Sequence, residues 1–446
     1  MRETNYKFST AIAMVIGIVI GCGIEFKADD ILVAVNGKVG LGVLGFLIVG
    51  IGVIFGALTI SAYAQQDDKQ IGITGYAQKA VGDRLGYTMG WFSLSVYYPA
   101  VIVVLAMVTS VYLEVLLGFE SQLFITIATL FFLACSFTIN IVSPKLGGRM
   151  QVGTTILKVI PLIVIGGVGT LFFTGTQDPS AITNAGEVVA SNAPLSALIA
   201  IAFAFDGWIV ATNIAHELDS KKTLTRALAI GTSVIVVLYV LYFYGITQVV
   251  DPKEIMSLGD AHTELAAERI LGQIGGHILT AFVVISVYGG LNGFTLSYLR
   301  QPANFAKSGV VKPSLAAEND TDGKKGIFTC LGLVGFYFVF QQLLDYGVIF
   351  PNLESAFDLS VLPIIINYVF YMILFIFVNK LVKDKPMKER VYYGVISVIA
   401  TLIALLVIYG ALQVNGLPYL AFSVLMLLAG LPFYQPSKSF AVENSR

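Results

Sequence analysis

Gly21-Cys22-Gly23-Ile24-Glu25 interrupts an apolar run that extends from about residue 8 to about residue 34. A run of this length can cross a bilayer, because a spanning helix needs about 20 predominantly apolar residues. Two glycines and a carboxylate near its middle disfavour one continuous helix. In lipid, unwound backbone is tolerated only where its N–H and C=O groups are buried in protein or face a water-filled cavity. The stretch therefore predicts a broken spanning helix.

A second apolar run is interrupted in the same way, at Phe203-Ala204-Phe205-Asp206-Gly207-Trp208. Broken helices at corresponding places in two halves of a chain are the best sequence pointer to the binding site of a secondary transporter. For the first break alone, a glycine hinge or close helix packing is an equally good interpretation. The presence of a second break favours the interpretation as a binding site.

The composition is that of a polytopic membrane protein. Of 446 residues, 56% are hydrophobic and 12% are charged, and the mean hydropathy is +0.82, which is too apolar for a soluble domain. A net charge of -1 gives no reason to expect nucleic acid as a partner. The first apolar run is too long for the core of a signal peptide, so we expect it to be retained as a span.

The hydropathy pattern predicts an all-α integral membrane fold with about twelve spanning helices. A turn signal at Asn415-Gly416-Leu417-Pro418 separates the last two, and residues 436–446 are expected to form a tail. The expected spans are 8–34, 39–66, 85–117, 121–143, 150–174, 195–218, 223–250, 270–300, 326–345, 357–380, 391–413 and 418–435.

The basic residues predict the orientation of these spans. With the N-terminus inside, most of the 27 Lys and Arg residues fall in inside segments, and only Lys27, Lys38, Lys253 and Arg269 fall outside. Cytoplasmic loops carry such an excess. We therefore expect both termini to be cytoplasmic and the protein to lie in the plasma membrane.

The two breaks offer complementary backbone chemistry. N–H groups exposed at residues 21–24 begin the following half-helix, where the positive end of the helix dipole favours a carboxylate. Carbonyl groups freed at residues 203–208 can accept from an ammonium group. Together they fit the backbone of an α-amino acid. The aromatic residues Phe203, Phe205 and Trp208 have an alternative role as core or lipid-facing residues, which we prefer for Trp208.

Two ionisable side chains lie at membrane depth. Asp206 is costly there, by about 3 kcal/mol on insertion scales, and such a residue is by default a functional-site hypothesis. Lys158 lies in an otherwise uncharged run, and Gln151, Thr154 and Thr155 form a polar stripe with it on one helical face. We expect that face to look inward. Snorkelling to the membrane interface is the alternative for Lys158, but its position near the middle of the span disfavours it.

Motifs for other functions are absent. The three histidines, His216, His262 and His277, lack metal-ligand spacing, and no phosphate-binding loop, dinucleotide fingerprint or nucleophile motif occurs. A membrane-embedded enzyme or a non-transporting sensor is therefore a weaker alternative, and no metal, cofactor or ATP is expected.

At these residues the chain resembles the amino acid/polyamine/organocation (APC) superfamily, and within it bacterial L-amino acid transporter-like permeases. The resemblance covers the first ten spans. The matching positions are Gly21 to Ile24, Phe203 to Trp208 with Asn213, Glu217, Lys221 and Arg226-Ala227, and also Gly75-Tyr76, Gly90-Trp91, Lys158 and Gly290-Leu291-Asn292-Gly293.

The resemblance implies a single transporter domain over residues 1–435. It would contain two inverted five-helix repeats, approximately 8–174 and 195–380, and two extra helices in 391–435. It further implies that an L-amino acid is moved by alternating access, by sodium-independent exchange or with protons. Proton-coupled transport of cationic amino acids or polyamines is the alternative.

The resemblance also implies roles for individual residues. N–H groups of Cys22, Gly23 and Ile24 would bind the substrate carboxylate, while the backbone near Val19, Phe203, Ala204 and Asp206 would bind its amino group. Lys158 would stand where sodium-dependent relatives bind a cation, and Asn292 is a candidate selectivity residue.

Two positions depart from the family pattern, which usually has Ser at Cys22 and an aromatic residue at Glu25. The first change is nearly isosteric and preserves backbone contacts. Glu25 adds a carboxylate to the outer half-helix, so it is a candidate for selecting a cationic side chain. Pairing with Lys27 or another base, and exposure to an aqueous vestibule, are its alternatives.

Overall fold

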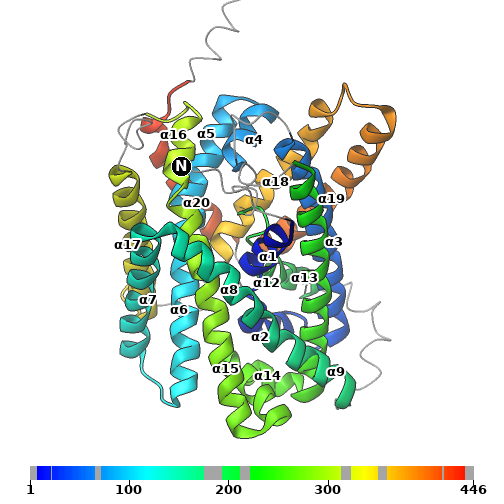
Figure 1. The fold of residues 1–446 in the computed structure, drawn as a ribbon, viewed down its shortest axis with the longest axis vertical. Coiled ribbons are helices and arrows are strands. Elements are labelled where there is room, and N and C mark those ends of the chain that lie inside the picture. The colour runs from blue at the N-terminus through cyan, green and yellow to red at the C-terminus, as the bar shows by residue number, and fades with distance from the viewer. Residues whose placement is uncertain are drawn as a thin grey trace, which may run out of the picture.

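The computed structural model describes residues 8–21, 23–65, 72–174, 193–210, 221–312, 323–349, 359–413 and 416–436. Within these ranges the protein is a bundle of helices with no named strand (Figure 1). The only β pairing there is one isolated bridge between Val311 and Tyr434. The prediction of an all-α fold is therefore confirmed.

The helices of the first half begin and end at the following residues: α1 Phe8–Val19, α2 Ile24–Ala34, α3 Val39–Ala64, α4 Gly72–Ala80, α5 Asp83–Phe92, α6 Tyr98–Leu117, α7 Gln122–Val142, α8 Pro144–Ile163 and α9 Gly169–Phe172. In the second half they are α12 Ala193–Ala204, α13 Lys221–Val249, α14 Pro252–Leu258, α15 His262–Tyr298, α16 Gln301–Lys307, α17 Lys324–Asp345, α18 Val361–Leu381, α19 Met387–Gln413 and α20 Gly416–Gly430.

In the described part of the chain, nine helical segments are long and apolar enough to cross a membrane, or ten if the bent pair α1–α2 is one span. Two shorter apolar helices, Leu195–Ala204 and Pro418–Phe433, lie where the sequence predicts the sixth and twelfth spans. The structure thus supports a multi-pass membrane protein. The remainder of the expected sixth span, from residue 211 to residue 218, lies outside the described residues.

The broken helices lie inside the bundle. Helix α1 packs against α8, α13 and α15, and α12 packs against α2, α3 and α19. In Figure 1, α4, α5 and α16 lie at one end of the molecule and α14 lies at the other, close to α2. We call these the α4 end and the α14 end.

Two of the long helices contain a π-helical segment, η1 at Ser93–Tyr97 and η2 at Val164–Val168. Each lies within five residues of a proline, Pro99 or Pro161. Proline donates no backbone hydrogen bond and disturbs the regular ladder around it. The π-helical turn η1 brings Tyr97 into the interior, where it becomes part of the site described below.

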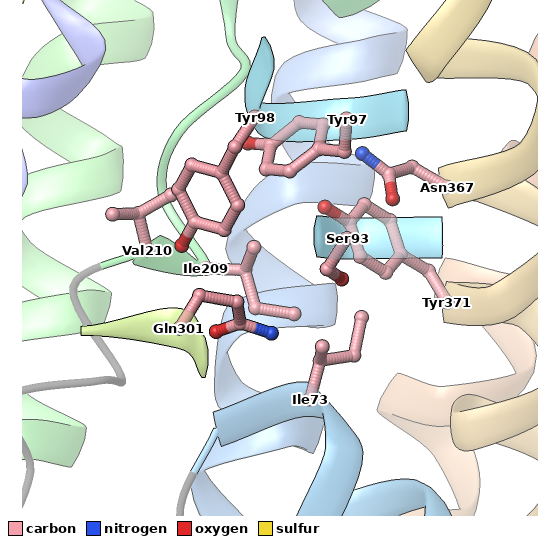
Figure 2. A pocket seen from close by; sticks show the side chains of 9 residues that line it. All are labelled: Ile73, Ser93, Tyr97, Tyr98, Ile209, Val210, Gln301, Asn367 and Tyr371. Carbon is pink, nitrogen blue, oxygen red and sulfur yellow. The ribbon is translucent and has the colours of Figure 1, made fainter. Parts of the chain in front are cut away.

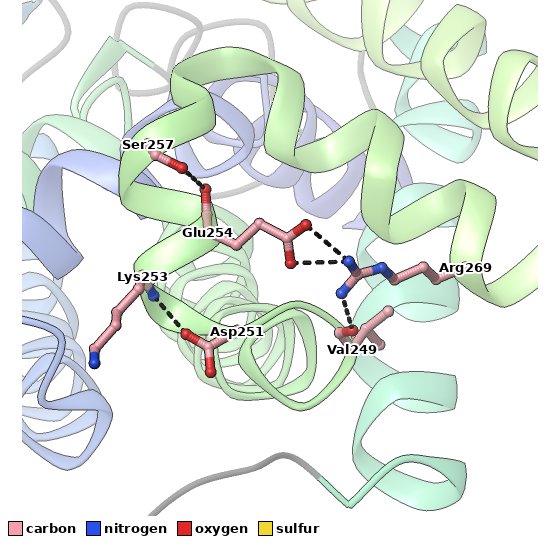
Figure 3. A network of polar contacts seen from close by, with 6 residues as sticks. All are labelled: Val249, Asp251, Lys253, Glu254, Ser257 and Arg269. Atoms are coloured by element: carbon pink, nitrogen blue, oxygen red, sulfur yellow. Dashed lines mark hydrogen bonds and ion pairs between the residues drawn. The ribbon is translucent and has the colours of Figure 1, made fainter.

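A polar network at the α14 end connects α14 to α13 and α15 (Figure 3). The Arg269 guanidinium donates to both carboxylate oxygens of Glu254, each at 2.8 Å, and to the carbonyl oxygen of Val249 at 3.1 Å. Asp251 caps α14, because its side chain accepts from the backbone N–H of Lys253. Helix α14 packs on α2, so this network holds α14 as a cover over the second half of the first broken helix.

Candidate functional site

The first break lies between α1 and α2, whose axes differ by 48°. Gly21 adopts φ +106, a conformation that favours glycine. A Cβ atom there would lie 2.5 Å from the carbonyl oxygen of Ser286 on α15. The chain therefore unwinds in direct contact with α15, and only glycine fits at this point.

The second break follows Ala204, the last residue of α12. The Asp206 N–H donates to the Phe203 carbonyl at 2.8 Å, forming a tight turn. Gly207 has φ +95, and a Cβ there would lie 2.9 Å from Ile18 on α1. A Cβ at Gly23 would in turn lie 3.1 Å from the Ala204 Cα. The two breaks are thus in contact and form one site.

Backbone donors and acceptors lie at the two breaks. Helix α2 begins at Ile24, and Gly23 provides no side-chain cap for it, so its first N–H groups lack intrahelical acceptors. Two carbonyl groups provide the acceptors. The Val19 carbonyl accepts from the Tyr239 hydroxyl at 3.0 Å, and the Phe203 carbonyl accepts from the Asp206 N–H. Each carbonyl keeps a second lone pair for a ligand. Cys22 lies outside the described residues.

Lys158 reaches the first break from α8. Its side chain is 0% exposed, and its ammonium donates to the Gly17 carbonyl near the end of α1. Thr155, one turn earlier, donates to the Ala13 carbonyl at 3.2 Å. Gln151 is also buried. The polar stripe therefore faces α1 in the interior, and snorkelling to an interface is excluded for Lys158.

Asp206 is 4% exposed and lies within electrostatic range of the hydroxyl groups of Tyr97, Tyr368 and Tyr371. A small pocket with a volume of ≈ 20 Å³ adjoins this cluster on the side of the α4 end (Figure 2). Its lining comes from α4, η1, α6, α16, α18 and the second break, with Ile73, Ser93, Tyr97, Tyr98, Ile209, Val210, Gln301, Asn367 and Tyr371.

Several buried polar atoms lie around this pocket. The Tyr97 hydroxyl interacts with the Asp206 carboxylate. Within the described part of the chain, no hydrogen bond reaches the Tyr371 hydroxyl or the amide nitrogen of Asn367, and both atoms are buried. Buried polar atoms are normally satisfied by protein, water or ligand. The cluster can therefore bind water or a polar ligand beside the second break. Trp208 is buried against Tyr371, in agreement with the core role preferred for it.

Glu25 faces away from this pocket. Its side chain is 0% exposed, and Oε1 accepts from the Ser286 hydroxyl on α15 at 3.1 Å. Its backbone carbonyl accepts from Tyr112 at 2.7 Å and Thr263 at 3.0 Å. Lys27 contacts Asp30 instead, at 2.7 Å. Exposure of Glu25 in an aqueous vestibule is thus wrong for this conformation, because α6 and α15 enclose the residue.

Asn292 joins three helices rather than lining the pocket. Its Oδ1 accepts from Asn140 on α7 at 2.9 Å, and its Nδ2 donates to the carbonyl of Gly147 on α8 at 2.9 Å. This arrangement fixes α15 relative to α7 and α8. The selectivity role for Asn292 stays a prediction.

The sequence did not identify all the polar residues near the breaks. Asn367 and Tyr371 lie four residues apart in an apolar helix, so they share one helical face, and that spacing was a usable signal. Ser286 gives no such signal, because its importance depends on contact with residues far away in the chain.

The chain is similar to known amino acid permeases. Residues 6–431 match the family model for amino acid permeases. The chain is 28% identical over 435 residues to the serine/threonine exchanger SteT of Bacillus subtilis (strain 168), an alignment that covers 96% of this chain and 95% of that protein.

Two human proteins are also similar. Asc-type amino acid transporter 1 is 26% identical over 316 residues, covering 69% of this chain and 60% of the relative. The cystine/glutamate transporter is 23% identical over 288 residues, covering 63% of this chain and 57% of the relative. These relatives are transporters or exchangers of amino acids by name, not enzymes.

Proposed function

The chain belongs to the amino acid permease family, and on that premise we propose that it carries an L-amino acid across the plasma membrane by alternating access. The family and the relatives make it a multi-pass amino acid transporter rather than an enzyme. The observation that carries the mechanism is the contact between the two breaks, where the uncapped start of α2 lies against the end of α12.

The proposed grip on the substrate uses backbone groups. The N–H groups of Cys22, Gly23 and Ile24 bind the carboxylate, since the positive end of α2 favours an anion. The carbonyl groups of Val19, Phe203 and Ala204, with the Asp206 backbone, bind the ammonium group. Both interactions are common to all α-amino acids. The surrounding helices then contact the side chain of the substrate and determine which amino acids bind.

Access to the site alternates between the two ends of the bundle. In this conformation Glu25 is enclosed at the α14 end, whereas the pocket beside Asp206 lies towards α4 and α16. The distribution of Lys and Arg supports a cytoplasmic α4 end, with both termini on that side. The two inverted repeats, residues 8–174 and 195–380, would exchange the open and closed ends, with residues 391–435 as accessory helices.

The proposed coupling is sodium-independent exchange or proton coupling, without ATP or a prosthetic group. Support comes from Lys158, whose ammonium occupies the space between α1, α8 and α15, and from the similarity to a serine/threonine exchanger. A proton-coupled carrier of cationic amino acids or polyamines is the second candidate, favoured by the buried carboxylate of Asp206 beside the pocket.

Transport by the purified protein in proteoliposomes tests the proposal. Labelled L-serine, L-alanine, L-leucine, L-lysine and putrescine are offered outside, with and without unlabelled amino acid inside, in sodium-free buffer. Faster uptake into loaded vesicles than into empty ones supports exchange. Uptake of putrescine or lysine alone supports the second candidate. No uptake of any amino acid, with folded protein in the vesicles, contradicts amino acid transport.

A further inference from the structure

We propose that the Glu25 carboxyl group is a proton-binding site, opposite Lys158 across the first break, whose protonation accompanies substrate movement. This inference rests on the proposed transport function and names the site of its coupling ion. It differs from a role in recognising the substrate side chain, because the carboxylate faces Ser286 on α15 and is not part of the pocket lining.

The first argument is the burial of Glu25. Its side chain is fully enclosed, and the carboxylate accepts from the Ser286 hydroxyl through Oε1 and also interacts with the Glu25 backbone N–H. Oε2 is buried and accepts no hydrogen bond from the described residues. An ionised carboxylate with an unsatisfied oxygen is costly in such a place, whereas the neutral acid is much less so. The environment therefore permits both the charged and the protonated form.

The second argument is the set of groups that face Glu25. Lys158 on α8 is within electrostatic range of the carboxylate. The other titratable neighbours are Tyr112 on α6, Tyr242 on α13 and His262 on α15, which faces the Glu25 backbone. Among these, Lys158 is the cation. The ionised carboxylate is therefore balanced by one ammonium group, and that balance is lost when the carboxylate binds a proton.

This balance links protonation to conformation. Glu25 belongs to α2, on the outer side of the first break, while Lys158 binds Gly17 on the inner side. Attraction between the charges holds α2 against α8 and α15. When Glu25 is neutral, that attraction is absent, and α2 can separate from α15 more easily. Reopening of the α14 end is then favoured by a proton.

The third argument is that buried polar atoms lie on both sides of the pair formed by Glu25 and Lys158. Towards the α4 end, both amide atoms of Gln151 are buried without a partner among the described residues, and they lie 2.9 to 3.0 Å from the Cβ position of Gly293. Towards the α14 end, Asp29 Oδ1 is likewise buried without a hydrogen-bond partner among the described residues. Ordered water commonly satisfies such groups. Water bound at these atoms would bring exchangeable protons close to the pair on both sides.

The step itself is simple. The carboxylate takes one proton from the solution on one side and becomes a neutral carboxylic acid, and it releases that proton on the other side. No other bond forms or breaks. The proton gradient in the medium supplies the driving force.

The test separates exchange from proton coupling in the full-length protein. Proteoliposomes receive labelled L-serine under two conditions: counterflow at equal pH, and empty vesicles at internal pH 8 and external pH 6, with the membrane potential clamped by potassium and valinomycin. One-to-one coupling allows about tenfold accumulation for each pH unit of gradient, because both quantities correspond to about 1.4 kcal/mol. A trapped pH dye reports proton entry on addition of serine.

We expect wild-type protein to accumulate serine under the gradient and to acidify the vesicle lumen. Glu25→Gln should retain counterflow and lose both responses. Glu114→Gln is the matched control, because Glu114 is also buried but lies on α6, where it accepts from the Ser121 N–H. This control should keep the gradient response.

Ser286→Ala provides a second test if Glu25→Gln does not fold. Removing the donor to the ionised carboxylate should let the proton bind at higher pH, so gradient-driven uptake should persist to a higher external pH than in wild type. A gradient response that survives in Glu25→Gln, or an unchanged pH profile in Ser286→Ala, overturns the inference. So does wild-type counterflow without any gradient response, which leaves amino acid transport intact. Absence of all transport by wild type overturns the proposed function instead.

Discussion

Lys158 connects helix α8 to the first break through a charged hydrogen bond. Its ammonium donates to the Gly17 carbonyl, one turn before α1 unwinds. A buried hydrogen bond to a charged group contributes about 1.5 to 3 kcal/mol. Because it acts at the break, we expect this interaction to determine whether the site forms rather than whether the bundle folds.

Lys158→Ala should therefore reduce serine uptake by at least about tenfold, the factor that corresponds to 1.4 kcal/mol, while the amount of protein in the membrane stays normal. Uptake and membrane abundance are measured on the same preparation. Lys380→Ala is the control, since Lys380 lies exposed at the end of α18. Near-normal uptake by Lys158→Ala at normal abundance would refute a role at the break.

Gly21 is constrained by both its backbone and its neighbour. Its φ of +106 is strained for other residues, and a Cβ would lie 2.5 Å from the Ser286 carbonyl. Such strained conformations cost about 1 to 3 kcal/mol each, before the steric overlap is added. Gly21→Ala should lower the melting temperature in detergent and abolish uptake. Gly153→Ala on α8 is the matched control, because no atom lies within 4 Å of its Cβ position.

The control should be neutral or slightly stabilising, by up to about 1 kcal/mol, because alanine is the better helix former. If Gly21→Ala behaves like Gly153→Ala in both assays, the close approach of the first break to α15 does not matter for transport.

At the residue scale, the sequence predicted those features that a single segment determines. Lys158 stands out because a charge in an apolar run must face the interior or an interface. The contact of Tyr239 with the Val19 carbonyl and that of Ser286 with Glu25 join residues more than 200 positions apart. No local pattern encodes such pairs. They depend on how the helices pack.

At the scale of elements, apolar length predicted the long helices well. The turn signal near residue 415 correctly separated α19 from α20. The short helices α4 and α14 and the two π-helical segments were not predicted. Hydropathy detects helices that cross the bilayer, and these elements either cover the ends of the bundle or modify a longer helix internally.

The cover formed by α14 yields a prediction about stability. Arg269 and Glu254 contact each other through two hydrogen bonds but are both partly exposed, with 38% of each side chain accessible. Exposed ion pairs contribute about 0.2 to 1 kcal/mol. Arg269→Ala and Glu254→Ala should each lower the melting temperature slightly, and the double variant should be less destabilised than the sum. Strict additivity would mean that the pair in Figure 3 contributes no coupling energy.

At the scale of the whole molecule, the outer surface of the bundle fits a lipid environment. Helix α7, for example, exposes Leu123, Ile127, Leu130 and Phe131. Such a face would be an aggregation hazard in water and is stable in lipid. Charged and amide side chains such as Glu25, Lys158, Gln151 and Asp206 are buried near the two breaks and in the α8–α15 contact, away from this apolar outer face.

The orientation in the membrane follows from charge and can be tested by labelling. The distribution of Lys and Arg predicts a cytoplasmic α4 end. Lys388 is exposed at the start of α19, and Glu120 is exposed in the connection between α6 and α7. The expected inside and outside segments place Lys388 in the cytoplasm and Glu120 outside. In a background without the three native cysteines, Glu120→Cys and Lys388→Cys are treated on intact cells with a membrane-impermeant maleimide.

Glu120→Cys should be labelled at once, and Lys388→Cys only after the membrane is permeabilised. The test depends on charge rather than on packing, because inverting the bundle would leave every helix contact unchanged and only move the basic loops to the other side. Each variant must first show normal serine uptake, so that the labelled population is the functional one. The reverse labelling pattern would place the pocket beside Asp206 on the outer side of the membrane. The α14 cover would then face the cytoplasm.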